Sequence, residues 1–204
     1  MNTRSSSFGQ NYEQSIVDRL GIWLSTRRIV RLTKSSKAQS VGDFGCGYNA
    51  ELARQIRPLV NKVVLADVSL NQELLDSAEY DTNVGILPGV LENIANNSLD
   101  LIVMNSVLEH LDNPVATLES IRKILSPGGV LFINVPSWLG KRVLEFAAFR
   151  LKLSPAEEME DHRRYYNKRE LWLELRSSGF SPSKIKIHRH KFGTNVYAIV
   201  QVDD

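Results

Sequence analysis

Five short apolar runs, separated by segments of helical periodicity, occupy the middle of the chain. They are residues 40–44, 62–68, 83–87, 99–105 and 130–136. Runs of this length that are rich in Val, Ile and Leu are typical of buried parallel strands, whose sheet is covered by helices on both faces. The sequence therefore predicts an α/β fold with a doubly wound sheet. The helix before the last run is expected to end at the Pro-Gly-Gly turn of residues 127–129.

The segments on either side extend this prediction. Residues 12–34 carry apolar side chains at helical spacing and predict one or two leading helices. Residues 183–190 alternate as a partly exposed strand, residues 195–202 supply another, and the turn-like sequence FGTN separates them. We expect these two strands to pair as an antiparallel hairpin at the edge of the sheet.

The alternation of strands and helices stops after residue 136. Residues 137–166 predict an amphipathic helix followed by a polar loop, which is the pattern of an insertion or lid. We therefore expect an N-terminal helical cap over residues 1–37 and a main domain over residues 38–204, with residues 137–166 as its lid.

Charge and cysteine content limit the classes of function. The 25 Lys and Arg residues nearly balance the 23 Asp and Glu residues, so we expect no general affinity for nucleic acid. Cys46 is the only cysteine, which excludes an internal disulfide and an all-cysteine metal cluster and favours a reducing, cytoplasmic setting.

Membrane insertion is not expected either. No stretch approaches the roughly 18 to 20 apolar residues that span a bilayer. Residues 138–153 combine an apolar face with flanking basic residues, which permits peripheral membrane contact. The preferred interpretation is that this helix covers the active site or a dimer interface, so we expect a monomer or a homodimer.

The first predicted strand ends in a glycine-rich turn, DFGCGYNA. Gly45, Gly47 and Ala50 fit the loose pattern G-x-G-x-x-A of dinucleotide-binding turns, so an NAD(P)-dependent oxidoreductase has to be considered. In those proteins the turn receives a pyrophosphate, which the carboxylate of Asp43 would repel. Asp43 suits a ligand with positive charge at this end. A tight turn without any ligand is the structural alternative.

A second acid ends the second predicted strand. Asp67 is placed to accept hydrogen bonds from two ribose hydroxyls, as acids do at this position in nucleoside-binding folds. Asp43 and Asp67 thus bracket a ligand with an amino group at one end and a ribose further along. S-adenosylmethionine has that layout and carries no phosphate.

Four segments together resemble the class I S-adenosylmethionine-dependent methyltransferases, in particular the small-molecule group called type 11 or type 12. The segments are DFGCGYNAELA, ADVS, SLDLIVMNSVLEHLDNP and LSPGGVLFINVP, in order over about residues 38–202. The resemblance implies a Rossmann-like sheet of seven strands with an antiparallel last strand. It also implies S-adenosylmethionine as cofactor and methyl transfer to oxygen or nitrogen of a small molecule or carrier-linked metabolite. A non-catalytic S-adenosylmethionine-binding module is the alternative.

The resemblance carries two departures. Asn49 stands where these enzymes usually have a third glycine, although asparagine tolerates positive φ. Val90 stands where they have an acid that binds the adenine amino group, so we expect apolar contact from Val90 and Leu91 instead. Asn105 and Ser106 end the fourth strand, where a ligand is expected, and a helix N-cap is their alternative role. The expected cofactor residues are Asp43, Gly45, Cys46 (through its backbone), Gly47, Asp67, Val68, Val90, Leu91, Asn105 and Ser106.

Candidate substrate residues follow the fourth strand and the insertion. His110, in the sequence SVLEHL, is the candidate catalytic base, since its ordinary pKa is about 6.5, and structural hydrogen bonding is its alternative role. His162, Arg163, Tyr165 and Tyr166 are expected on the substrate side, against the alternative of a solvated charged loop. No metal is expected, because His188 and His190 share a strand face without a third ligand.

Overall fold

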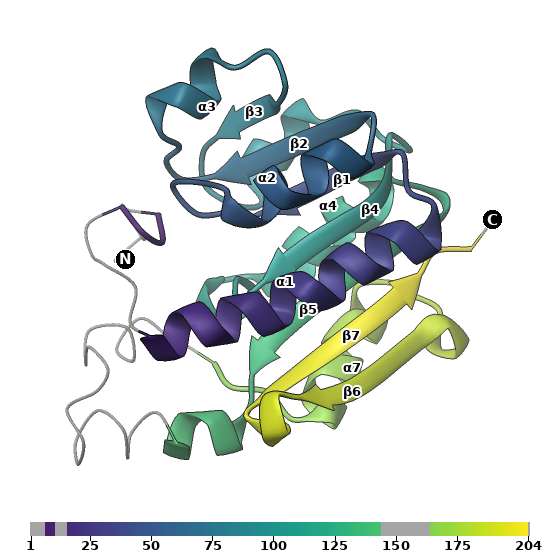
Figure 1. Cartoon of the computed structure of the whole chain (residues 1–204). Coiled ribbons are helices and arrows are strands. Elements are labelled where there is room, and N and C mark those ends of the chain that lie inside the picture. The colour runs from purple at the N-terminus through teal and green to yellow at the C-terminus, as the bar shows by residue number, and fades with distance from the viewer. Residues whose placement is uncertain (1–6, 11–15, 144–163, 204) are drawn as a thin grey trace.

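The computed structural model describes residues 7–10, 16–143 and 164–203, apart from the side chains of residues 16–20. Within this part of the chain, seven strands form one sheet in the order β3-β2-β1-β4-β5-β7-β6 (Figure 1). The strands are β1 Ser40–Phe44, β2 Lys62–Asp67, β3 Asp81–Val84, β4 Leu99–Asn105, β5 Leu125–Pro136, β6 Ile185–His190 and β7 Asn195–Gln201. Neighbours from β3 to β5 are parallel, and β7 is antiparallel to both β5 and β6. The predicted sheet and its terminal hairpin are confirmed.

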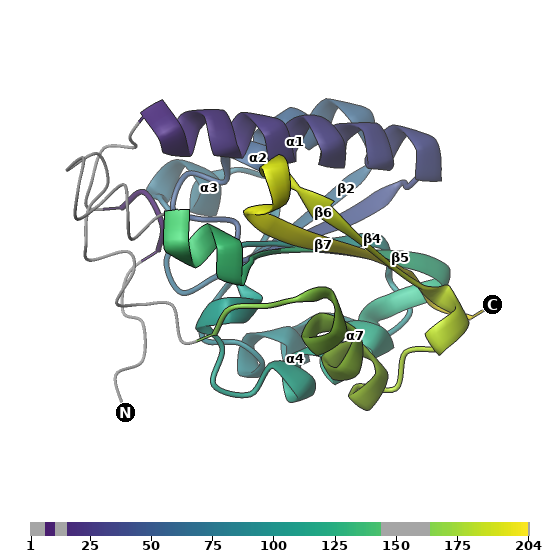
Figure 2. The same ribbon diagram turned by 90° about the horizontal axis from the view of Figure 1, so that it is seen from below.

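Helices cover both faces of this sheet (Figure 2). One face carries α1 Ile16–Ser36, α2 Glu51–Ile56 and α3 Gln72–Asp76, and the other carries α4 Pro114–Ile124 and α7 Lys168–Ser177. The described part of the leading segment is one helix, α1, and its Ile29 is fully buried against the first face. Of the expected lid, residues 138–143 are helical, and residues 144–163 lie outside the described residues. No helix in the described ranges is long and apolar enough to cross a membrane.

Local sequence signals explain where α7 begins and ends. The Asn167 side chain accepts a hydrogen bond from Glu170 N at 2.9 Å, and the Glu170 carboxylate accepts one from Asn167 N at 2.7 Å. This reciprocal pair satisfies backbone donors that have no partner within the helix. Gly179, with φ of 85°, then turns the chain away from the helix.

Most boundaries agree with the prediction to within two residues, and two elements differ by more. The strand expected over residues 83–87 is Asp81–Val84, because the chain turns at Gly85, after which Ile86 is exposed and Leu87 packs against the core without pairing. The helix expected to end at residues 127–129 ends at Ile124. Residues 126–129 instead form an irregularity in β5, whose pairing with β4 shifts register between Leu99 and Leu101.

The order of the strands positions the candidate site. From β1 the chain adds β2 and β3 on one side and then returns to place β4 on the other side. Ligands of open α/β sheets bind beyond the carboxyl ends of the strands at such a reversal. Because β1, β2 and β4 are parallel, Asp43, Asp67 and Asn105 come to the same edge of the sheet.

Candidate functional site

Asp67 organises the glycine turn. Its Oδ2 accepts a hydrogen bond from Gly47 N at 2.8 Å, and its Oδ1 accepts one from Val68 N at 2.7 Å. The side chain is largely buried, with 9% of the residue exposed. The structure therefore holds this carboxylate at the carboxyl end of β2, in contact with the turn that follows β1.

The N-terminal segment also reaches this carboxylate. The hydroxyl of Ser7 donates a hydrogen bond to Asp67 Oδ1 and accepts one from Ser69 N at 3.0 Å. Next to it, Phe8 O accepts a hydrogen bond from Tyr48 N at 2.9 Å. Residues 7–10 thus lie over the glycine turn. Sequence reasoning missed Ser7, because no local pattern marks a serine so far from the turn.

Both glycines of the turn are required by its geometry. Gly45 and Gly47 have φ of 75° and 76°, a conformation that side chains disfavour. A Cβ on Gly45 would lie 2.3 Å from Val107 Cγ2, and one on Gly47 would lie 3.2 Å from Phe8 O. Gly45 N meanwhile donates to Ala66 O at 2.7 Å, which joins the ends of β1 and β2.

The expectation for Asn49 is wrong. The positive φ after the two glycines occurs at Ala50, with φ of 47°, and not at Asn49. Ala50 is the residue at which the chain enters α2, so the left-handed step falls one position later. Asn49 has a different role, because its Oδ1 accepts a hydrogen bond from Asn71 Nδ2 at 2.9 Å.

Asp43, unlike Asp67, has a carboxylate oxygen, Oδ2, without a hydrogen-bond partner among the described residues. Asp43 is 2% exposed. Burial, together with the negative charge of Asp67, raises the pKa of Asp43 to about 7. A buried carboxylate without a partner is costly unless a cation or a proton accompanies it. The arrangement fits a ligand that carries an ammonium group.

Cys46 lies between the two glycines. Burial and the carboxylates of Asp43 and Asp67 raise the pKa of its thiol well above the ordinary value. Because the thiolate is the reactive form, this thiol is a poor nucleophile. That Cys46 contributes to the cofactor site through its backbone stays a prediction.

The remaining expected cofactor residues fall into two groups. Val90 and Leu91 lie in the 3₁₀ turn η2, Gly89–Asn93, and are buried in the hydrophobic core. Asn105 Oδ1 accepts a hydrogen bond from Asn134 Nδ2 at 3.0 Å, and Ser106, with φ of 60°, donates through its backbone to Asn134 O. The N-cap alternative for Asn105 and Ser106 is wrong, because η3, Leu108–His110, is preceded by Val107 and has no side-chain cap.

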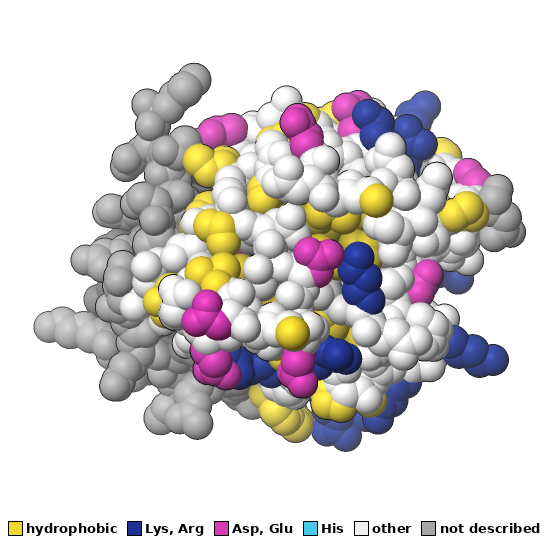
Figure 3. All heavy atoms as spheres, turned by 90° about the horizontal axis from the view of Figure 1, so that it is seen from above, with side chains coloured by type: hydrophobic (Ala, Val, Ile, Leu, Met, Phe, Trp, Pro, Cys, Tyr) yellow, Lys and Arg dark blue, Asp and Glu magenta, His cyan; other side chains and the backbone are white. Residues whose placement is uncertain are grey.

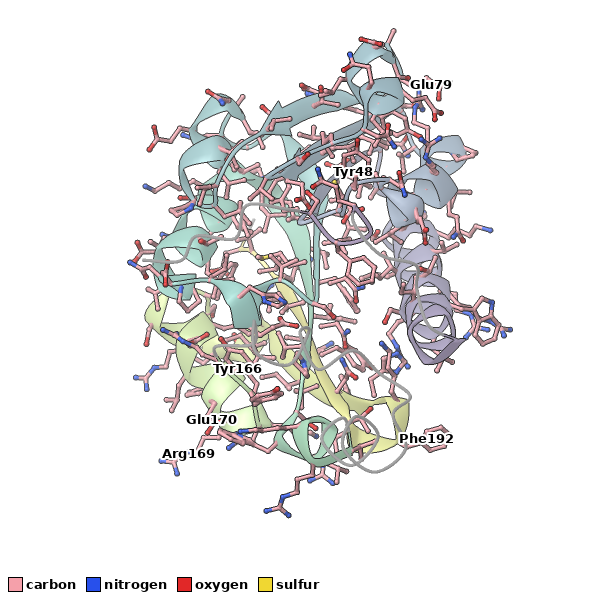
Figure 4. The ribbon with its side chains drawn as sticks, turned by 90° about the vertical axis from the view of Figure 1, so that its left-hand side faces the viewer. Tyr48, Glu79, Tyr166, Arg169, Glu170 and Phe192 are labelled. Carbon is pink, nitrogen blue, oxygen red and sulfur yellow. The ribbon has the colours of Figure 1, made fainter. Side chains whose placement is uncertain are left out.

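Of the expected substrate-side residues, Tyr165 and Tyr166 border a separate cavity of about 350 Å³, and His110 does not line it. Tyr165 and Tyr166 are 8% and 2% exposed, so the alternative of a solvated loop does not hold for these two residues. Figure 4 views the end of the molecule that carries Tyr48 of the glycine turn, and Tyr166 and Glu170 lie toward the same viewer. The lining residues are Trp138, Lys141, Arg164, Tyr165, Tyr166, Glu170 and Glu174.

Both carboxylates of this cavity have partners. Glu170 Oε2 accepts a hydrogen bond from Trp138 Nε1 at 3.1 Å. Glu174 pairs with Arg164 at 3.0 Å and accepts a hydrogen bond from the Tyr166 hydroxyl at 2.9 Å. Burial and the charge of Glu174 raise the pKa of Tyr166, so this phenol stays protonated at neutral pH and is not a base. Sequence reasoning missed Trp138, Glu170 and Glu174 as members of this site.

Among the described residues, the histidines that the sequence singled out do not line this cavity. His110 ends η3 and is partly buried. His162, like Arg163, lies outside the described residues. His188 and His190 contact the ring of Tyr197, with centroid distances of 5.2 and 5.9 Å. In the described ranges no three His, Cys, Asp or Glu side chains are placed to hold a metal ion.

Comparisons with known proteins identify the family of this chain. The sequence model of the methyltransferase domain family matches residues 22–184. A malonyl-[acyl-carrier protein] O-methyltransferase of Halalkalibacterium halodurans is 26% identical over 113 residues, which is 51% of this chain and 41% of that protein. The ubiquinone/menaquinone biosynthesis C-methyltransferase UbiE of Coxiella burnetii is 33% identical over 98 residues, which is 43% of this chain and 39% of that protein. The chain spans about two fifths of the length of these relatives.

A solved structure supports the fold over most of the chain. The plantazolicin methyltransferase BamL, in complex with a triazolic desmethylPZN analog and SAH, superposes with a TM-score of 0.70. The match covers 92% of this chain and 88% of that one, at 12% identity. At that identity the likeness concerns the arrangement of the sheet and its helices.

Proposed function

Because the chain belongs to the methyltransferase domain family of class I S-adenosylmethionine-dependent methyltransferases, we propose that it methylates oxygen or nitrogen of a small molecule or carrier-linked metabolite. The observation that carries this proposal is the buried, unpartnered Oδ2 of Asp43 beside the glycine turn. That oxygen disfavours the pyrophosphate of an NAD(P)-dependent enzyme and favours the ammonium group of S-adenosylmethionine.

Each end of the cofactor has a group of residues that fits it. Asp43 and the backbone of Gly45, Cys46 and Gly47 would hold the amino-acid end, and Asp67 would accept the ribose hydroxyls. Val68 and the buried pair Val90 and Leu91 would border the adenine, with Asn105 and Ser106 at the end of β4. The cofactor supplies a methyl group already activated on a sulfonium centre. The chain has mainly to align the acceptor with it, and alignment of this kind lowers a barrier by about 7–11 kcal/mol.

The N-terminal turn bears on cofactor access. Ser7 already donates to the carboxylate of Asp67, which is the group assigned to the ribose. A ribose hydroxyl that binds Oδ1 must therefore replace the Ser7 hydroxyl. This supports the proposal that residues 1–37 form a cap, whose segment 7–10 opens when the cofactor enters.

The cavity of Trp138, Tyr165 and Tyr166 is the proposed acceptor site. It lies at the same end of the sheet as the glycine turn (Figure 4), and these three aromatic side chains are part of its wall. Its Glu170 and Glu174 are committed to hydrogen bonds within the protein, so they hold the wall in place. His110 is the proposed base when the acceptor is a hydroxyl, whereas an unprotonated amine needs none.

Two further assignments belong to this proposal. A cytoplasmic location is part of the proposal and is supported by the presence of a single cysteine. A carrier-linked acceptor is supported by the name of the relative that acts on a malonyl-acyl carrier protein.

The test is a calorimetric titration of the full chain with S-adenosylhomocysteine and, separately, with NADH. Wild type is expected to bind only the former, and Asp67→Ala is expected to weaken binding at least about a hundredfold, since charge-assisted hydrogen bonds are lost. Unchanged affinity in Asp67→Ala would remove the ribose assignment. Incubation with labelled S-adenosylmethionine and a panel of hydroxyl and amine acceptors separates an enzyme from a non-catalytic binding module, because only the enzyme transfers label.

A further inference from the structure

Two segments far apart in the sequence meet at one corner of the molecule. The helical residues 138–143 follow β5, and the short turn η5, Lys191–Gly193, joins β6 to β7. Ser137 Oγ donates a hydrogen bond to Gly193 O at 2.6 Å, and Ser137 N donates one to Thr194 O at 2.9 Å. Figures 1 and 2 both place the two segments side by side.

This corner exposes four large apolar side chains, which we call the apolar corner: Trp138, Leu139, Val143 and Phe192. Their exposed fractions are 49%, 49%, 48% and 101%. Phe192 is held at φ of 57°, a left-handed conformation that is unusual for a bulky residue. Its ring points away from the protein in Figure 4. A phenyl ring that a backbone turn holds fully exposed to water adds nothing to the hydrophobic core. Its exposure indicates a role in binding to another surface.

The charged side chains that the two segments themselves contribute are all basic, and an acid next to them, Glu170 on α7, accepts a hydrogen bond from Trp138. Residues 137–143 and 184–195 contain no Asp or Glu. Their charged side chains are the basic residues Lys141, Arg142, Lys184, Lys186, Arg189 and Lys191. The face seen in Figure 3 differs, since acidic and basic side chains are interspersed there. At the opposite edge of the sheet, α2 and α3 form the mixed pair Arg54–Glu73, and β2 and β3 form Lys62–Asp81.

We propose that the apolar corner docks on an anionic lipid surface. Protruding aromatic and aliphatic side chains enter the boundary between headgroups and acyl chains, and flanking basic residues are attracted by anionic lipids. A symmetric dimer through this corner would set two basic rims against each other, which opposes self-association. Trp138 belongs to both the apolar corner and the wall of the cavity, so docking brings that cavity to the membrane surface.

The test is co-sedimentation of the full chain with vesicles of phosphatidylcholine alone and of equimolar phosphatidylcholine and phosphatidylglycerol. We expect binding to the anionic vesicles that weakens as salt is added. Phe192→Gly is expected to weaken it about tenfold or more, since the insertion of one phenyl ring is lost. Glycine adopts φ of 57° without strain, so this variant keeps the turn. Arg142→Glu is expected to reduce binding to anionic vesicles about fivefold or more.

Two matched controls accompany these variants. Ile86→Ser removes an apolar side chain that is 57% exposed after β3, the strand at the opposite edge of the sheet, and Lys34→Glu reverses a charge in the last turn of α1. Both are expected to bind vesicles like the wild type. The proposal is overturned if wild type does not sediment with anionic vesicles, or if Phe192→Gly and Arg142→Glu sediment as it does. It is also overturned if Phe192→Gly dissociates a dimer in solution, or if the corner binds RNA and not vesicles.

Discussion

The hydroxyl of Ser7 lies against the carboxylate of Asp67, across 60 positions of the sequence. The same carboxylate accepts the backbone N–H groups of Gly47 and Val68. One acid therefore fixes the glycine turn and the N-terminal segment at once. A ligand that competes for this acid has to displace the segment, which couples binding to the position of residues 7–10.

Removal of the Ser7 hydroxyl is expected to strengthen cofactor binding. In Ser7→Ala the ribose no longer competes with a hydrogen bond to a charged acceptor, so the Kd for S-adenosylhomocysteine should fall about five- to tenfold. Isothermal titration calorimetry measures this change, and Ser35→Ala on the exposed end of α1 is the control. Weaker binding by Ser7→Ala would mean that Ser7 assists the cofactor.

The buried Asp43 predicts a dependence of stability on pH. Its pKa is 3.8 as an ordinary side chain and about 7 in the folded protein. Between these pH values the folded state holds a proton that the unfolded state has lost. The free energy of unfolding should therefore fall as the pH rises from about 4 to about 7 and change no further above that.

Asp43→Asn is expected to remove this dependence. At pH 8 the variant should be more stable than wild type by on the order of 2–4 kcal/mol, while its affinity for S-adenosylhomocysteine falls. Urea unfolding at pH 5 and pH 8 measures the first effect, with Glu119→Gln on the exposed face of α4 as the control. A wild-type stability that rises between these pH values would contradict the assignment.

Gly45→Ala is expected to destabilise the fold. The new methyl group would lie 2.3 Å from Val107 Cγ2, at a residue with φ of 75°. Strain and overpacking together should cost about 2–4 kcal/mol, measured by chemical denaturation. Gly89→Ala is the matched control, since a Cβ there meets nothing within 4 Å. Equal stability of the two variants would show that the turn can relax around a side chain.

Trp138→Ala tests the acceptor cavity. The change removes one aromatic wall and leaves the glycine turn untouched, so KM for the acceptor should rise about tenfold or more. The Kd for S-adenosylhomocysteine should stay within about twofold. Trp172→Ala is the control, because Trp172 stacks with Arg176 on α7 and does not line the cavity. A loss of cofactor affinity in Trp138→Ala would place Trp138 at the cofactor.

Local patterns in the sequence predicted most of the fold. The apolar run of residues 99–105 is β4 without any change of boundary, because a buried parallel strand is continuously apolar. The two glycines of the turn also follow from sequence, since positive φ next to a strand end favours glycine. Patterns failed where packing overrode them: Leu87 is apolar because it packs against the core, not because it pairs in the sheet.

The chemistry of the site depends on distances that the sequence does not contain. Sequence placed Asp43 and Asp67 at strand ends, but only the packed sheet buries Asp43 and raises its pKa. The contact of Ser7 with Asp67 and the cavity of Trp138 and Tyr166 join segments that are distant along the chain. Periodicity reports which face of an element is buried, and it carries no information about which remote side chain arrives there. Which remote side chains meet is determined only when the helices and strands pack around one core. Desolvation and hydrogen bonding then act between the groups that this packing brings together.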